Sequence, residues 1–156
     1  MEAHPHVESR SELNGLAIAA TTHCLIGCAT GEVVGMALAE IFGWSNLAQT
    51  LLAIALAYCF GFALTSVPLI KAGLPPRKIV STALASDTVS ITIMEVIDNL
   101  VVILIPSALD AGLEDALFWG SIAAGFAIAY PFAFLGNRYL IARGRGHAVM
   151  HEYHSH

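Results

Sequence analysis

The side chains best suited to chemistry begin in a stretch near residue 21. Steps of four residues place side chains on one face of a helix, so Cys24, Cys28, Glu32 and Met36 share one stripe, and His23 lies on the stripe beside it. Thiolate, imidazole and thioether groups suit soft metals such as Cu(I) or zinc, whereas carboxylates suit harder ions or protons. Adjacent His23 and Cys24 diverge by about 100° around a helix. The stretch therefore predicts a cation site without fixing the ion.

A second stretch, residues 87–99, supplies three acids at helical spacing. Asp87, Met94 and Asp98 fall on one stripe, and Glu95 lies on the adjacent one. We expect the helices that carry the two stretches to run in the same direction, so a rise of ~1.5 Å per residue brings their polar residues level in pairs. One level holds His23, Cys24 and Asp87, and the other holds Glu32, Glu95 and Asp98. The predicted metal set is His23, Cys24, Cys28, Glu32, Met36, Asp87, Met94, Glu95 and Asp98.

Apolar segments must position these side chains. The chain has 156 residues, of which 56% are hydrophobic and 12% charged, and its mean hydropathy is +0.70. A soluble domain of this composition would lack polar surface, and a helix needs about 20 apolar residues to cross a bilayer. We expect an all-α membrane protein, an antiparallel bundle of four transmembrane helices at about 14–43, 47–70, 79–109 and 116–140. This domain, residues 14–143, would lie between tails at 1–13 and 144–156.

The distribution of charge predicts the orientation. All seven cationic residues fall at one end of the expected bundle: Arg10, Lys71, Arg77, Lys78, Arg138, Arg143 and Arg145. The positive-inside pattern places that end and both termini in the cytoplasm, in a multi-pass protein of the inner membrane. The other end carries acids, Glu40, Asp110, Glu114 and Asp115. They could form an outer mouth that concentrates cations, or simply a solvated loop.

The acids inside the expected spans have no basic partner nearby, since the only Lys or Arg within these spans, Arg138, lies at the cytoplasmic end of the last one. A carboxylate in the bilayer is costly and normally marks function. The acids could be protonated, bind a cation or line a water-filled passage. Alternatively, protonated acids could hydrogen-bond to Thr88, Ser90 and Thr92 and merely hold the helices together.

Three further patterns have simpler explanations beside functional ones. Gly27, Gly31 and Gly35 form a small-residue stripe that lets another helix approach, in this chain or a neighbouring copy. Cys59 alone is expected to pack as a small apolar residue. Short histidine-rich tracts bind metals, so the tails could capture metal or could be ordinary polar tails. The tail histidines are His4, His6, His147, His151, His154 and His156.

Several stretches carry a family resemblance. They include His23–Cys28, Gly31–Met36, Asp87–Ile91, Met94–Glu95 with Asp98–Asn99, and Asn137–Val149. On these the chain resembles, over nearly its whole length, a bacterial membrane family catalogued as domain of unknown function four-three-nine-six. The resemblance implies a four-helix membrane unit, and it brings no activity with it.

Our leading hypothesis is an oligomeric membrane protein, a dimer or trimer in contact through the first helix, that binds and transports a transition-metal cation. Copper is favoured over zinc. One alternative is an accessory subunit that stabilises or metallates a larger membrane redox complex. A second is a proton channel or proton-coupled carrier. We expect no enzyme, organic cofactor or nucleic-acid partner, because no nucleophile, base and orienting group occur together and no cofactor fingerprint is found.

Overall fold

The described part of the chain, residues 10–71 and 73–143, is all-helical in this computed structural model. Its long helices are α1 (Arg10–Phe42), α2 (Asn46–Lys71), α3 (Pro76–Leu104) and α4 (Ala116–Ala142). A short 3-10 helix, η1 (Ala108–Asp110), lies between α3 and α4. The histidines of both tails lie outside the described residues, so the predicted metal capture there stays a prediction.

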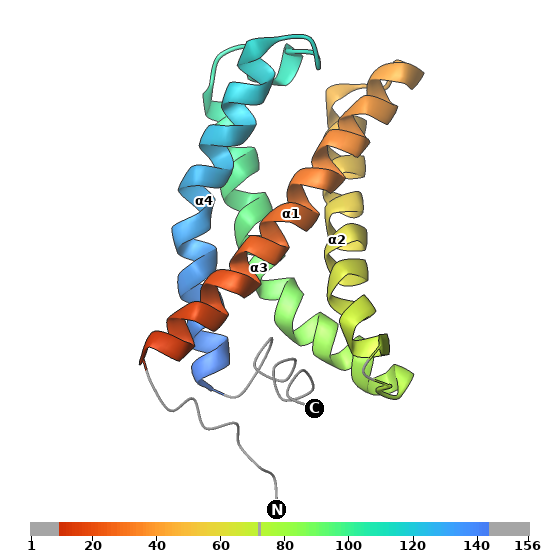
Figure 1. Cartoon of the computed structure of the whole chain (residues 1–156). Coiled ribbons are helices and arrows are strands. Elements are labelled where there is room, and N and C mark those ends of the chain that lie inside the picture. The colour runs from red at the N-terminus through yellow and green to blue at the C-terminus, as the bar shows by residue number, and fades with distance from the viewer. Residues whose placement is uncertain (1–9, 72, 144–156) are drawn as a thin grey trace, which may run out of the picture.

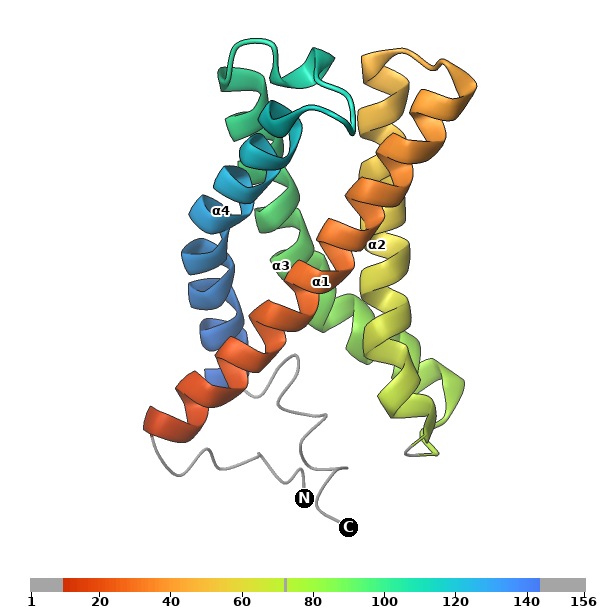
Figure 2. The ribbon, with the colours of Figure 1, turned by 45° about the horizontal axis from the view of Figure 1, so that its top comes forward.

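Consecutive helices run in opposite directions (Figure 1). The start of α1, the turn between α2 and α3 and the end of α4 therefore lie at one end of the molecule. We call this the basic end, because every described Lys and Arg lies there: Arg10, Lys71, Arg77, Lys78, Arg138 and Arg143. The turn between α1 and α2 and the connection between α3 and α4 lie at the opposite, acidic end (Figure 2). Gly43 and Gly73 make the two short turns at positive φ, 64° and 75°, which glycine adopts without strain.

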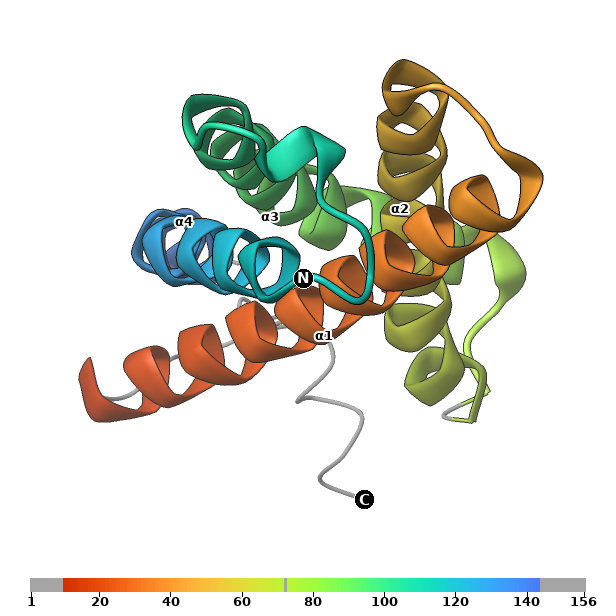
Figure 3. The ribbon, with the colours of Figure 1, turned by 90° about the horizontal axis from the view of Figure 1, so that it is seen from above.

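Helix α1 crosses the width of the molecule, beside α4 at its start and α2 towards its end (Figure 3). Near the basic end, Ala17 and Ala20 pack with Ile141 of α4. Further along, a Cβ added at Gly27 would lie 2.9 Å from Gly61 Cα of α2, and one at Gly35 would lie 2.6 Å from Ala53 Cα.

The middle glycine of the stripe is the most tightly covered. A Cβ at Gly31 would overlap the backbone of Ala57 on α2. The stripe formed by Gly27, Gly31 and Gly35 is therefore filled by α2 of the same chain, which is one of the two partners the sequence left open. The expected contact between copies through this stripe would have to displace α2.

Two helix boundaries differ from the sequence expectation by four residues or more. α3 ends at Leu104 rather than near residue 109, because Ile105 precedes Pro106 and takes an extended conformation (φ −85°, ψ 117°), and α-helical geometry is disfavoured before proline. Ser107 then adopts a left-handed φ of 63°, and η1 follows. At the other boundary, α1 begins at Arg10, four residues before the predicted start, because the polar residues ahead of the apolar segment continue the helix.

Among the residues that the structure describes, three helical segments are long and apolar enough to cross a membrane: Arg10–Phe42, Asn46–Val67 and Ala116–Ala142. Together with the all-helical fold, this confirms the expectation of an all-α chain with membrane-type helices. α3, the fourth expected span, is not among the three. It carries Asp87, Glu95 and Asp98, and these acids lower its hydropathy.

Candidate cation-binding site

Three carboxyl groups from two helices meet in the interior. Glu32 of α1 and Glu95 and Asp98 of α3 are only 2%, 4% and 1% exposed. Glu32 and Asp98 lie within hydrogen-bonding reach of each other, and Glu95 lies close to both. Two carboxyl groups can share a hydrogen bond only if one of them carries a proton. A hydrogen bond between Glu32 and Asp98 would therefore require a proton on one of the two carboxyl groups. We call Glu32, Glu95 and Asp98 the acid cluster.

Several oxygens of the acid cluster lack a nitrogen or oxygen donor. Among the described residues, Glu32 Oε2, both carboxyl oxygens of Glu95, and Asp98 Oδ1 are buried without a hydrogen bond from nitrogen or oxygen, and the Cys28 thiol lies within hydrogen-bonding reach of Glu95. A buried acceptor without a donor costs about 1–3 kcal/mol, and more when it is charged. No Lys or Arg occurs at positions 11–70 or 79–137 to offset this cost. The cluster is consequently stabilised by anything that brings positive charge or a hydrogen-bond donor into it.

Helix α4 closes the acid cluster from a third side at Gly125. A Cβ there would overlap Asp98 Oδ1 and would lie 2.8 Å from Asp98 Cγ and 3.1 Å from Asp98 Cα. Only glycine leaves room for the carboxyl group. The sequence reasoning missed this residue, although a signal was present: small or polar side chains recur every four residues along α4, at Ser121, Gly125, Ala129, Ala133 and Asn137, and all five are buried.

A second polar group lies nearer the basic end. Asn137 Nδ2 of α4 donates to Thr21 Oγ1 of α1 (2.9 Å) and to Ser90 Oγ of α3 (3.0 Å). Cys24 lies within hydrogen-bonding reach of Ser90 and close to Asp87. The structure thus brings together Cys24 and Asp87 of one expected level, and Glu32, Glu95 and Asp98 of the other. Asn137 was not foreseen as the residue that joins three helices.

Replacing Asn137 by Leu should lower stability by about 1 kcal/mol, since hydrogen bonds between membrane helices are worth about 0.6 kcal/mol on average and Asn137 makes two. The measurement is denaturant unfolding of the detergent-solubilised chain. Asn46→Leu is the control, because Asn46 makes one exposed hydrogen bond, to Asp110 at the acidic end. A smaller loss for Asn137→Leu than for Asn46→Leu would contradict the role of Asn137 as a link between helices.

The soft ligands of the predicted metal set come from two helices, α1 and α3, and Met36 packs against the core that holds Cys24, Cys28 and Met94. Cys28 lies beside Glu95, and Met94 packs in the same buried core as Cys24 and Cys28. His23 is half-buried, whereas half-buried Met36 lines a pocket at the acidic end. Within residues 10–71 and 73–143, no group of three or more His, Cys, Asp and Glu residues is placed to hold a metal ion. Cys24, Cys28 and Cys59 are all free thiols, and Cys59 is exposed.

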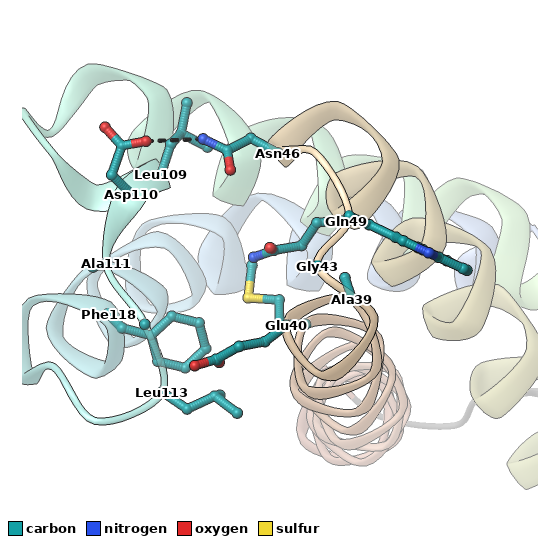
Figure 4. A pocket seen from close by; sticks show the side chains of 13 residues that line it. Ala39, Glu40, Gly43, Asn46, Gln49, Leu109, Asp110, Ala111, Leu113 and Phe118 are labelled. Atoms are coloured by element: carbon teal, nitrogen blue, oxygen red, sulfur yellow. Dashed lines mark hydrogen bonds between the residues drawn. The ribbon is translucent and has the colours of Figure 1, made fainter.

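The four acids at the acidic end lie around two neighbouring hollows. Glu40 and Asp110 line a pocket of about 260 Å³, whose polar side chains Figure 4 shows. Glu40 also lines an open hollow of about 460 Å³ with Glu114 and Asp115. The structure thus brings together the residues predicted to form an outer mouth.

Comparison with protein families gives one match that spans the described helices almost completely. The family model described as Domain of unknown function (DUF4396) matches residues 15–146. The chain belongs to this family. The resemblance seen in the sequence is thereby confirmed, and it extends from the first turns of α1 past the end of α4. Neither the curated proteins nor the solved structures give a match. Function must therefore be argued from the site itself.

Proposed function

We propose that this chain spans the cytoplasmic membrane with four helices and passes protons through the acid cluster. Both termini would lie inside, since every described Lys and Arg is at the basic end and basic residues are retained in the cytoplasm. α3 would be the fourth span. Its acids point into the molecule, while Val89, Val96, Leu100 and Ile103 are 42–60% exposed and would face lipid.

The observation that carries this proposal is the set of buried carboxyl oxygens that receive no hydrogen bond from nitrogen or oxygen within the described part of the chain. In lipid such groups are costly and mark ion or proton pathways. A proton satisfies them most simply, because it binds one carboxyl oxygen and needs no shell of ligands, whereas Ca²⁺ or Mg²⁺ takes about six or more oxygen ligands. Glu32 and Asp98 lie within hydrogen-bonding reach of each other, so a proton has two adjacent carboxyl groups to bind.

Transition-metal transport is the second candidate, and the placement of two thiols favours it. Cys24 and Cys28 lie one helical turn apart, are both buried, and face Asp87 and Glu95 of α3. Thiols select Cu(I) or zinc, with copper preferred. Metal analysis of the purified chain should then show bound copper that is lost in a Cys24→Ser/Cys28→Ser double variant and retained in Cys59→Ser. Equal metal content in all three proteins would contradict this candidate.

Proton flux tests the leading proposal. The purified chain is reconstituted in vesicles that contain a pH-sensitive dye, and a potassium gradient with valinomycin drives protons across the bilayer. We expect a flux above that of empty vesicles, with the sign set by the applied potential. A flux equal to that of empty vesicles at both polarities would contradict the proposal.

A further inference from the structure

The pocket of about 260 Å³ opens at the acidic end, between the end of α1, the start of α2 and the connection from α3 to α4. We call it the outer pocket. Figure 4 shows polar side chains from all three segments around it: Glu40, Gln49 and Asp110, the last held by the 2.9 Å hydrogen bond from Asn46 Nδ2. Within the described chain no Lys or Arg lies at this end. The outer pocket is therefore polar, open and negatively charged.

The lining of the outer pocket continues inwards. Met36 and Phe118 line both this pocket and a smaller cavity of about 10 Å³. Val102, Ser121 and Ile122 line the smaller cavity but not the outer pocket. A volume of this size holds about one water molecule. Phe118 is 2% exposed and packs edge-on against Trp119, with ring centroids 5.1 Å apart. Phe118 is thus a buried aromatic side chain in the wall that the two cavities share.

The acid cluster lies one helical turn beyond this smaller cavity on three helices at once. Glu32 is four residues from Met36 on α1, and Asp98 is four residues from Val102 on α3. Gly125, which lies against Asp98, is four residues from Ser121 on α4. One turn of helix is about 5.4 Å. A displacement of Phe118 would therefore leave only a short step between the outer pocket and the Glu32–Asp98 pair.

We infer that the outer pocket is the entrance through which the acid cluster exchanges protons with water at the acidic end, and that Phe118 is the gate that closes it. The identification of the entering species as a proton rests on the proposed function. The entrance itself rests on the shared pocket lining and on the one-turn spacing along α1, α3 and α4.

A reporter thiol at position 121 tests the entrance. Ser121→Cys is nearly isosteric and is introduced with Cys59→Ala, which removes the exposed native thiol. Charged methanethiosulfonate reagents that do not cross lipid are added to either side of the vesicles, and Glu114→Cys marks the acidic face. We expect slow reaction from the acidic face, about tenfold faster reaction when Phe118→Ala lowers the barrier, and a preference for the cationic over the anionic reagent.

Matched variants separate the gate from general loosening of the fold. Phe132→Ala removes the same ring from a position of α4 that is 54% exposed, and it should leave the labelling rate unchanged. Val102 lines the same cavity, so Val102→Cys serves as the reporter thiol if Ser121→Cys fails to fold. Equal labelling with Phe118 and with Phe118→Ala, or labelling from the basic face alone, would overturn the inference.

Flux in the same vesicles keeps the two proposals distinct. If labelling follows the expected pattern but the chain shows no proton flux, the entrance is retained and the proposed function is ruled out. If the unchanged chain shows proton flux but Phe118→Ala alters neither the labelling nor the flux, the proposed function is retained and the gate is ruled out.

Discussion

Glu32→Gln reduces the proton flux of reconstituted vesicles to that of empty vesicles, if the acid cluster carries the proton. The substitution removes a titratable carboxyl group that is 2% exposed and lies within hydrogen-bonding reach of Asp98. The glutamine amide has nearly the same shape and can still donate a hydrogen bond to the Asp98 carboxylate. The variant should therefore fold and reconstitute normally, so the lost flux would report the lost proton site. The measurement is the initial rate of dye response at both polarities, with the thermal stability of the same preparation.

The control for this prediction is Glu114→Gln. It makes the same chemical change at an exposed position in the connection between α3 and α4, where water can replace the lost carboxylate. We expect at least half of the flux of the unchanged chain. A Glu32→Gln variant that conducts as well as Glu114→Gln would contradict the role of the cluster. A variant that conducts normally but is less stable would instead support the alternative in which the acids only hold the helices together.

The meeting of the acids could be predicted from sequence because few quantities decide it. Helical spacing determines which side chains share a face, and the common direction of α1 and α3 with a constant rise per residue determines which are level. Glu32 and Asp98 required nothing more. The stripe formed by Gly27, Gly31 and Gly35 could also be recognised as a helix-packing surface from the sequence, although the sequence did not show whether α2 or another copy of the chain would pack against it.

The metal set predicted from sequence is spread along α1 over two levels, so its members on this helix could not all bind one ion. Twelve residues separate Cys24 from Met36, which is ~18 Å along a helix. One ion cannot contact both ends of such a stripe. Met36 consequently lines the outer pocket while Cys24 lies beside Ser90 and Asp87, near the basic end of the polar interior. Spacing along a helix shows that side chains share a face, but only their depth shows that they share a site.

The part played by α4 was not predicted, because it depends on how that helix is rotated about its own axis. A nearly uniformly apolar helix gives little sign of which face lies inward. Only its small residues marked the inward face. The structure shows their role, because Gly125 lies against Asp98 and Asn137 donates a hydrogen bond to Ser90. The closure of the acid cluster is thus a tertiary property shared by α1, α3 and α4.

Gly31→Ala should destabilise the chain strongly for so small a change. The added Cβ would overlap the backbone of Ala57 on α2, and backbone cannot rotate away as a flexible side chain can. Overpacking of this kind costs about 1–3 kcal/mol, and we expect the upper part of that range. The measurement is the melting temperature and the denaturant midpoint of the detergent-solubilised chain.

Gly120→Ala is the matched control for Gly31→Ala. A Cβ at Gly120 on α4 meets nothing within 4 Å, so this variant should show only the gain of about 1 kcal/mol that alanine brings to a helix interior. The difference between the two variants therefore isolates the contact of α1 with α2. Similar shifts for both would mean that α1 does not pack on α2 through Gly31. In that case Glu32, the next residue of α1, would lose the geometric basis for its position beside Asp98.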